Sequence, residues 1–170
     1  KVEYFESKFD IQINSKNVFY DAIKPKNSKA NIKVLVIGDS HAQGYNLMGE
    51  YYADKYQIEW HSYIYTGCPP IFGYYKIYNI EQIKSSKIQN ECKDQVKIWE
   101  NFIKENGKYF DYVILSSRWN FMFNHEIYEK KQYRKDALIK NNEIFINNNK
   151  IQTLSRSNFT NGLKNTINII

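Results

Sequence analysis

Several features that would assign a chain to a class at once are absent from this sequence. No apolar run approaches the ~20 residues of a membrane-spanning helix, and no charged segment followed by an apolar one marks a signal peptide. The phosphate-binding patterns Gly-x-x-x-x-Gly-Lys and Gly-x-Gly-x-x-Gly are also missing. Two cysteines and three scattered histidines are too few for a metal site or a disulfide scaffold. The 170 residues therefore indicate one domain with one core, and we expect no metal or cofactor.

The charge pattern argues against a nucleic-acid-binding protein. Lys and Arg total 24 against 18 Asp and Glu, which gives a net charge of +6. The basic residues are scattered and form no dense patch with interleaved aromatic residues. We interpret them as a Lys-rich solvated surface, with mild attraction to an anionic polysaccharide or membrane surface as the alternative.

Strands and helices alternate through the central part of the chain. Residues 32–37 predict a strand buried on both faces of a parallel sheet, and further strands are predicted at 57–65 and 112–117. Between them, helical spacing places apolar residues at two series of positions: Ala42, Tyr45, Met48, Tyr52 and Tyr56, then Ile88, Cys92, Val96, Trp99 and Ile103. Asn106-Gly107 is a typical helix stop. The β-α-β-α-β order predicts an α/β fold with parallel strands and right-handed connections.

The ends of the chain and residues 124–156 depart from this alternation. We expect residues 1–30 to be an N-terminal arm and linker, and residues 31–170 to form the domain. Residues 71–85 are predicted to be irregular. Residues 124–156 predict an insertion, with a hairpin over Asn147-Asn148-Asn149, before a last helix that starts near Asn158. Three parallel strands would leave an unpaired apolar edge, so we expect the domain to continue beyond Ile170.

The turn Gly38-Asp39-Ser40-His41 holds the first candidate functional residue. Ser40 follows the carboxyl end of the first predicted strand, where open α/β sheets bind their ligands. The turn enters a helix, whose free backbone N–H groups and dipole would stabilise a developing serine alkoxide. Ser40 is therefore a candidate nucleophile, and the alternative is that its hydroxyl only caps the helix. We expect Gly38 to permit the sharp turn and Asp39 to hold its shape.

Three short motifs together resemble a known family. Val36-Ile37-Gly38-Asp39-Ser40-His41-Ala42 is similar to the first block of the SGNH (GDSL-like) hydrolase superfamily. A narrower resemblance, to the SGNH domain attached to acyltransferase-3 membrane proteins, adds Gly67-Cys68-Pro69-Pro70 with a downstream Cys92, and Leu115-Ser116-Ser117-Arg118-Trp119. Those proteins O-acetylate surface polysaccharide, lipopolysaccharide or peptidoglycan. The resemblance covers residues 32–170. It implies a three-layer α/β/α sandwich with a mainly parallel sheet in flavodoxin-like order, whose C-terminal part is missing here.

The resemblance assigns roles to individual residues. Ser40 matches the family nucleophile, and its own N–H would be one donor of the oxyanion hole. Gly67 matches the glycine that supplies the next donor, with an ordinary turn glycine as the alternative. The family's Gly-x-Asn-Asp block is absent, and Asn120 is the nearest amide that would replace it. Arg118 would bind an anionic substrate group or pair with a carboxylate. Trp119 would stack on a sugar ring or belong to the core.

The general base is the most serious departure from the family. In the family it comes from Asp-x-x-His near the end of the domain, and no Asp of this chain has a His three residues later. His41 follows the nucleophile, where the family has a His that is not its base. His61 lies in a predicted strand, and His125 lies in the predicted insertion. Because a serine without a base is a weak nucleophile, we expect residues 1–170 to be inactive or nearly so, with the base in the missing part.

The two cysteines allow either one disulfide or two buried thiols. The resemblance implies a periplasmic or extracytoplasmic location, tethered to the membrane in the parent protein, where a bridge between Cys68 and Cys92 would persist. Such a bridge would tie the loop that holds Gly67 to the body of the domain.

The function expected from the resemblance is enzymatic. An acyl group, most simply acetyl, would pass through Ser40 to a carbohydrate hydroxyl, or to water in an esterase; a membrane domain of the same parent protein would deliver it. The alternative is a non-catalytic glycan-binding module, with Tyr74, Tyr75 and Tyr78 either at a sugar site or packed locally. A nucleotide-binding flavodoxin-like domain is a third interpretation, weakened by the lack of a Gly-rich phosphate loop.

Overall fold

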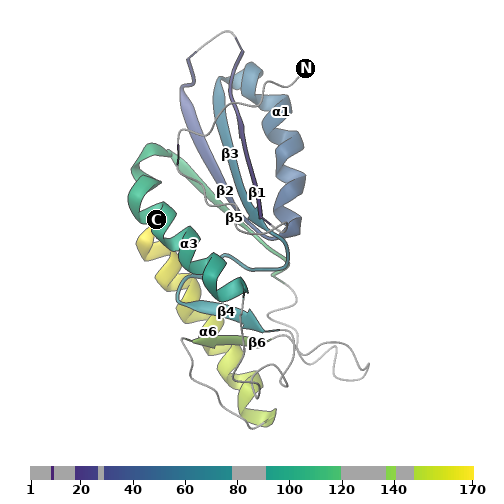
Figure 1. The fold of residues 1–170 in the computed structure, drawn as a ribbon, viewed down its shortest axis with the longest axis vertical. Helices are drawn as coiled ribbons and strands as arrows, with labels where there is room; N and C mark the ends of the chain where they lie inside the picture. The colour runs from purple at the N-terminus through teal and green to yellow at the C-terminus, as the bar shows by residue number, and fades with distance from the viewer. Residues whose placement is uncertain (1–8, 10–17, 27–28, 78–90, 120–136, 141–147) are drawn as a thin grey trace. The chain divides into compact units, whose positions relative to one another are not determined.

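A computed structural model describes residue 9 and residues 18–26, 29–77, 91–119, 137–140 and 148–170 (Figure 1). The chain divides into two compact units. The first comprises residues 1–67 and 105–117, and the second comprises residues 68–104 and 118–170. Each unit has its own sheet and its own cluster of buried apolar residues.

The first unit is built on an open four-stranded sheet with the strand order β1-β3-β2-β5 (Figure 1). Its strands are β1 (Val18–Ile23), β2 (Ile32–Gly38), β3 (Ile58–Tyr65) and β5 (Tyr112–Ser116). β2 pairs in parallel with both β3 and β5, which places Gly38 beside Ile64 and Ser116. The carboxyl ends of three parallel strands therefore meet at one edge of the sheet, as the order of the predicted elements required.

β1 lies in the segment that the sequence analysis placed in an N-terminal arm. It pairs antiparallel with β3, from Val18 beside Tyr65 to Ile23 beside Trp60. The sheet is therefore mixed, and a fourth strand that the sequence analysis did not predict pairs with the edge of β3. The strand has no regular alternation, because Val18, Ala22 and Ile23 are its buried residues. A period of two, the usual signal of a strand, was thus missing from the sequence.

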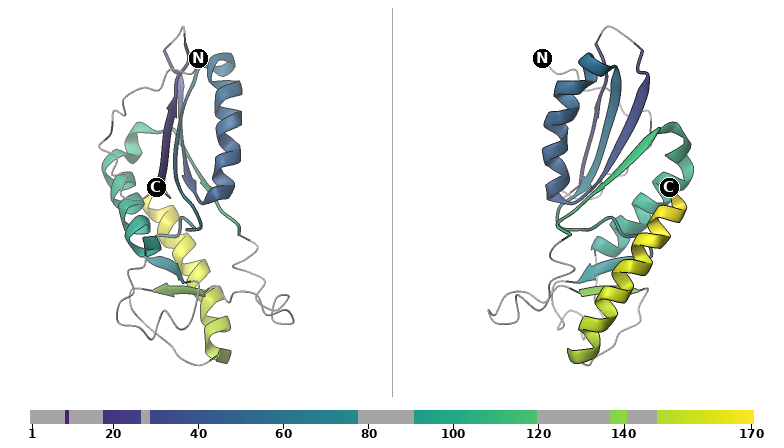
Figure 2. Two further views of the ribbon diagram at one scale, coloured as in Figure 1. Left: turned by 45° about the vertical axis from the view of Figure 1, so that its right-hand side comes forward. Right: turned by 180° about the vertical axis from the view of Figure 1, so that it is seen from behind.

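A short 3-10 helix, η1 (Ser40–Gln43), and the helix α1 (Gly44–Tyr56) follow β2 directly. α1 lies on one face of the sheet (Figure 2). Met48, one of the apolar positions of the predicted helix, is exposed. The helix instead approaches the sheet through a glycine, since a Cβ on Gly49 would lie 2.7 Å from the ring of Trp60. The close approach of the indole explains why the buried face of α1 consists of small residues.

The opposite face of the sheet holds a buried polar cluster on β3. Glu59 and His61 flank Trp60 in sequence and so point away from α1. The Nε2 atom of His61 lies 2.9 Å from a carboxylate oxygen of Glu59, and the hydroxyl of Tyr109 donates to both oxygens at 2.8 and 2.9 Å. The Nζ atom of Lys24 lies 3.5 Å from the same carboxylate. The buried charge is therefore paired and hydrogen-bonded, which a buried carboxylate requires.

This cluster shifts two pKa values in opposite directions. Burial alone would raise the pKa of Glu59, but the hydrogen bonds from His61 and Tyr109 and the charge of Lys24 outweigh it and hold the pKa below 4.5. Burial and the contact with Glu59 raise the pKa of Tyr109 to about 12. The stability that Glu59 contributes is present above the ordinary pKa and is lost as pH falls through the lowered one. The contribution of Tyr109 is present below pH 10.0 and is lost as pH rises towards about 12.

We expect Glu59→Gln to lower the free energy of unfolding at neutral pH by about 2 kcal/mol, because hydrogen bonds to a charged acceptor are weakened. The variant should also lose the part of the acid sensitivity that begins below pH 4.5. Thermal unfolding measured from neutral to acidic pH tests both effects. The matched control is Glu100→Gln, which removes only a surface pair with Lys104. An acid profile for Glu59→Gln equal to that of the wild type would contradict the role of the cluster.

The second unit contains a two-stranded antiparallel sheet and two helices. Its elements are β4 (Tyr74–Ile77), most of α3 (Glu91–Asn106), β6 (Ala137–Lys140) and α6 (Asn148–Ile169). β4 pairs with β6, and α6 packs against this pair (Figure 2). α3 ends at Asn106, which confirms the predicted stop. Of the five predicted apolar positions of this helix, Ile88 lies outside the described residues. The other four are buried: Cys92, Val96, Trp99 and Ile103.

Two predictions for this unit are wrong. Residues 74–77, in the segment expected to be irregular, form the strand β4. α6 begins at Asn148, so the last helix starts well before Asn158 and no hairpin turns over Asn148 and Asn149. Asn is a poor helix former, and β4 depends on a partner strand far along the chain. Local propensity therefore pointed away from both elements.

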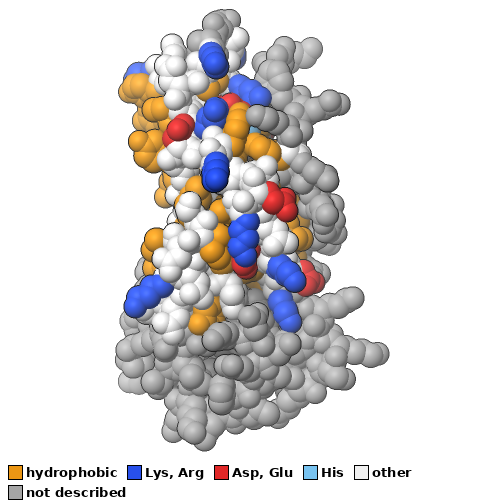
Figure 3. Space-filling view, turned by 90° about the vertical axis from the view of Figure 1, so that its left-hand side faces the viewer, with side chains coloured by type: hydrophobic (Ala, Val, Ile, Leu, Met, Phe, Trp, Pro, Cys, Tyr) orange, Lys and Arg blue, Asp and Glu red, His pale blue; other side chains and the backbone are white. Residues whose placement is uncertain are grey.

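The face drawn in Figure 3 fits the expected charge pattern. On the face that Figure 3 shows, Lys and Arg side chains are spread among hydrophobic and acidic ones rather than gathered together. None of the described helices combines the length and the hydropathy that crossing a membrane demands.

Candidate functional site

The turn after β2 is tightly packed against β5. The register pairs Gly38 with Ser116, and a Cβ on Gly38 would lie 1.8 Å from the carbonyl oxygen of Ser116 and 2.9 Å from the Cβ of Ala42. Only a glycine fits between the neighbouring strand and the first turn of η1. The sequence analysis assigned Gly38 to the sharpness of the turn, and the close approach of β5 gives a second reason for it.

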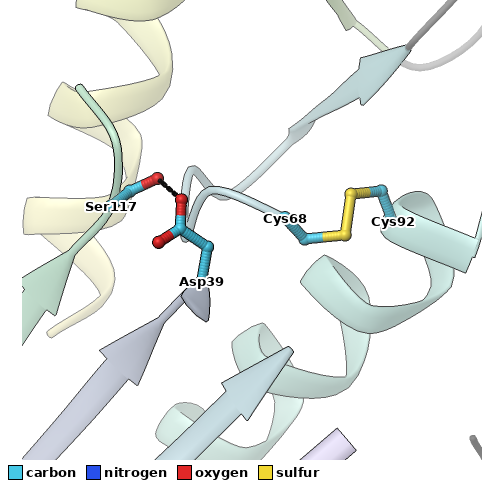
Figure 4. Close-up of a disulfide and its surroundings, with 4 residues drawn as sticks. All are labelled: Asp39, Cys68, Cys92 and Ser117. Atoms are coloured by element: carbon cyan, nitrogen blue, oxygen red, sulfur yellow. Dashed lines mark hydrogen bonds between the residues drawn. A yellow bond between two sulfur atoms is a disulfide. The ribbon is translucent and has the colours of Figure 1, made fainter. Parts of the chain in front are cut away.

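Asp39 organises this turn with both oxygens of its carboxylate. Its side chain is buried and caps η1: Oδ1 accepts a hydrogen bond from the backbone N–H of His41 at 2.9 Å. The Nδ1 atom of His41 lies 3.1 Å from the same oxygen. Oδ2 accepts a hydrogen bond from the hydroxyl of Ser117 at 2.6 Å (Figure 4). The expectation that Asp39 holds the shape of the turn is therefore met by contacts both within the turn and across to the end of β5.

Ser40 lies between Asp39 and His41 in the sequence, and its side chain is exposed. The N-cap of η1 is Asp39, so the capping role that was the alternative for Ser40 belongs to its neighbour. A hydroxyl that is exposed at the carboxyl ends of parallel strands, on a backbone held by a buried carboxylate, is well placed to meet a ligand. Chemically, such a serine is suited to act as a nucleophile once a base removes its proton.

Gly67 follows the end of β3 at the same edge of the sheet, because β3 runs parallel to β2. Its φ is +85°, a conformation that only glycine adopts readily. This backbone requirement supports the interpretation of Gly67 as a turn glycine. Its role as an oxyanion-hole donor stays a prediction.

Three further candidates come from the third motif and the residue after it. Arg118 and Trp119 belong to the second unit, and Arg118 is exposed. The ring of Trp119 packs edge-to-face on Phe159, with 5.8 Å between ring centroids, at the margin of the second unit's core. That packing corresponds to the core alternative for Trp119 rather than to a sugar platform. Asn120 lies outside the described residues.

Other residues considered for a site are buried or not described. Tyr74 was a candidate either for a sugar site or for local packing. It is 3% exposed and packs with Ile71 and Phe159, which agrees with local packing. His61 lies within β3, which confirms its predicted position in a strand, and it is 1% exposed. Tyr78 and His125 fall outside the described residues.

Cys68 and Cys92 form a disulfide (Figure 4), with a Cα–Cα distance of 5.4 Å. Both sulfur-bearing residues are buried and belong to the second unit. Of the two possibilities that the sequence left open, one disulfide or two thiols, the structure has the disulfide. Among the described residues, no group of three or more His, Cys, Asp or Glu side chains is arranged to hold a metal ion.

Ser117, directly after β5, contacts the turn through Asp39, and the sequence analysis predicted no role for it. It was quoted only as part of a motif. A signal was present, since Ser117 is the last residue of the third predicted parallel strand, and Ser40 comes shortly after the end of the first. Parallel strands in register bring such positions together, and the hydroxyl of Ser117 indeed reaches Asp39.

An exposed serine in a strand-to-helix turn, at the carboxyl ends of three parallel strands, is typical of α/β domains that catalyse acyl transfer or ester hydrolysis through a serine. The family model described as the SGNH domain (fused to AT3 domains) matches residues 10–170 of this chain. The chain therefore belongs to this SGNH family, which confirms the resemblance seen in its motifs. No characterised protein and no solved structure is significantly similar to it.

Membership in this family supports an acyl-transfer or esterase-like role. The fusion to AT3 domains supports a membrane acyltransferase domain as partner in the parent protein, and an extracytoplasmic position for the SGNH domain.

Proposed function

We propose that this domain transfers an acyl group, most simply acetyl, to a hydroxyl of a cell-surface carbohydrate through an acyl-serine intermediate on Ser40. The observation that carries the proposal is the turn itself: Ser40 is exposed while Asp39, its neighbour, takes over the capping role. The family match over residues 10–170 supports the same chemistry. The domain would form a three-layer α/β/α sandwich as part of a larger, periplasmic or extracytoplasmic membrane acyltransferase.

The reaction has two steps that use the same serine. In the first, Ser40 Oγ attacks the carbonyl carbon of the acyl donor and gives its proton to a base; the base passes this proton to the donor's leaving group, which departs to leave an acyl-serine. In the second, a carbohydrate hydroxyl attacks the acyl-serine and gives its proton to the base, which returns a proton to Ser40 Oγ as the C–O bond to Ser40 breaks. Water in place of the carbohydrate would give an esterase. The tetrahedral oxyanion of each step would be bound by the N–H groups of Ser40 and Gly67 and the amide of Asn120.

The base is the part that this chain does not provide in the family's form. No Asp in residues 1–170 is followed three residues later by a His. His61, the buried histidine, is already engaged by Glu59 and by the hydroxyl of Tyr20 at 2.6 Å. We therefore propose that residues 1–170 by themselves turn over substrate at a rate near background.

A single-turnover measurement tests the nucleophile without requiring a full catalytic cycle. Because a serine without a base is a weak nucleophile, the label is applied to the parent protein in which the domain is fused to AT3 domains. There we expect a fluorophosphonate or an activated acetyl ester to form an adduct on Ser40, located by mass spectrometry of peptides, and Ser40→Ala to abolish it. Thr160→Ala, at an exposed hydroxyl of α6, is the control and should leave the adduct unchanged. An adduct that persists in Ser40→Ala, or forms equally at other hydroxyls, would refute the assignment.

The second candidate function is a glycan-binding module on the same fold. The absent Asp-x-x-His pattern favours it, although the burial of Tyr74 removes one of its proposed sugar contacts. The two functions differ in what Ser40→Ala does. A binding module should keep its affinity for the glycan in this variant and should never form the adduct, whereas an acyltransferase should lose the adduct.

A further inference from the structure

The carboxylate of Asp39 connects two segments that are far apart in the sequence. One oxygen holds the backbone of His41, directly after Ser40, and the other accepts the hydroxyl of Ser117 at the end of β5. Both Asp39 and Ser117 are buried, with 5% and 8% of their surfaces exposed. A hydrogen bond between a hydroxyl and a carboxylate in such a place is among the stronger ones in proteins.

The two hydrogen bonds are coupled by the geometry of a carboxylate. Rotation about the Cβ–Cγ bond of Asp39 would move both oxygens together, because they belong to one planar group. Ser117 fixes this rotation by holding Oδ2, and Oδ1 is then kept on the N–H of His41. Without the hydroxyl of Ser117, Oδ2 loses this hydrogen bond, and the carboxylate is held less firmly against the backbone N–H of His41.

The backbone places Ser117 for this contact. The N–H of Asp39 donates to the carbonyl oxygen of Ser116 at 3.2 Å, and Gly38 packs directly on the same carbonyl. The register of β2 and β5 therefore puts the residue after Ser116 beside the side chain of Asp39. The contact is a consequence of the parallel sheet, whose edge carries the turn.

We propose that Ser117 is a positioning residue for the nucleophile: its hydroxyl holds the Asp39 carboxylate, which sets the backbone conformation of the turn and thereby the orientation of Ser40. This inference rests on the proposed function in that Ser40 is the residue being positioned. Ser117 itself contacts Asp39, and its effect on the reaction passes through that side chain.

The test compares Ser117→Ala with Ser117→Thr, which keeps a hydroxyl; labelling is measured in the parent protein with its AT3 domains, and hydrogen exchange in residues 1–170. The first measurement is the rate constant for phosphonylation of Ser40 by a fluorophosphonate, with Ser40→Ala as the blank. The second is hydrogen exchange of the His41 amide followed by NMR. We expect Ser117→Ala to lower the labelling rate about ten-fold and to speed exchange of the His41 amide. Ser117→Thr should restore both.

A matched control separates this effect from the general loss of a buried hydroxyl. Ser62, in β3, bonds with Asn46 and with the Nε1–H of Trp60 rather than with Asp39. Ser62→Ala should reduce stability yet leave the labelling rate and the His41 amide as in the wild type. Wild-type values of both readouts in Ser117→Ala would overturn the proposal. If the wild type is labelled no faster than Ser40→Ala, the proposed nucleophile fails, and exchange of the His41 amide still decides whether Ser117 holds the turn.

Discussion

Replacing Gly38 with alanine is expected to lower the free energy of unfolding by about 3 kcal/mol or more, because the added methyl group has no space. Its Cβ would meet the carbonyl oxygen of Ser116 at 1.8 Å, which is backbone and cannot rotate away. Relief requires β2 and β5 to separate at the edge that carries Ser40. The variant should therefore also lose labelling of Ser40, even where enough folded protein remains to measure it. Chemical denaturation and the fluorophosphonate adduct report the two effects.

A second glycine in the same region provides the control. Gly44 begins α1, and a Cβ there would meet no described atom within 4 Å. Because alanine has a higher helix propensity than glycine, Gly44→Ala should leave the free energy of unfolding unchanged or raise it by up to about 1 kcal/mol. If Gly38→Ala were as stable as Gly44→Ala, the close packing of β5 on the turn would be contradicted.

Removing the disulfide is expected to have the other large effect on stability. Replacing both Cys68 and Cys92 with alanine should lower the free energy of unfolding by about 3 kcal/mol, because the bridge closes a loop with a sequence separation of 24. The bridge lowers the conformational entropy of the unfolded chain, and its removal raises that entropy again, which favours unfolding. Thermal unfolding of the oxidised protein and of the double variant measures the difference.

The reduced wild type is the matched control for this pair. Treatment with a reductant should bring the stability of the wild type close to that of the double variant, since both then lack the cross-link. The reductant should leave the double variant unchanged, because Cys68 and Cys92 are the only cysteines of the chain. Equal stability of the oxidised and reduced wild type would show that the bridge contributes nothing.

The elements predicted correctly from the sequence share a physical property: their signals are local. β2 is a run of apolar, mostly β-branched residues, and α3 carries a stripe of apolar residues with a regular helical spacing. Each pattern lies within one segment and needs no knowledge of its partner. The turn at Ser40 was found for the same reason, because a strand, a glycine, two polar residues and a helix follow one another directly.

The elements that the sequence analysis missed depend on distant partners. β1 is held by pairing with β3, although its own residues do not alternate. β4 is a strand only because β6 pairs with it, and the two are separated by a long stretch of chain. The buried face of α1 was misjudged because Trp60, on another element, fills the space over Gly49. In each case tertiary contacts outweigh local preference.

The sequence by itself determined that this protein has an α/β domain with a candidate nucleophile at Ser40 and belongs with the SGNH domains, since strand patterns and short motifs are local. Only the tertiary structure decided that Asp39 rather than Ser40 caps the helix, that Trp119 and Tyr74 pack into a core, and that Ser117 holds the turn. Those outcomes depend on which side chains the sheet register and the chain path bring together in space. A linear pattern does not contain that information, because Asp39 and Ser117 meet only once β2 and β5 have paired.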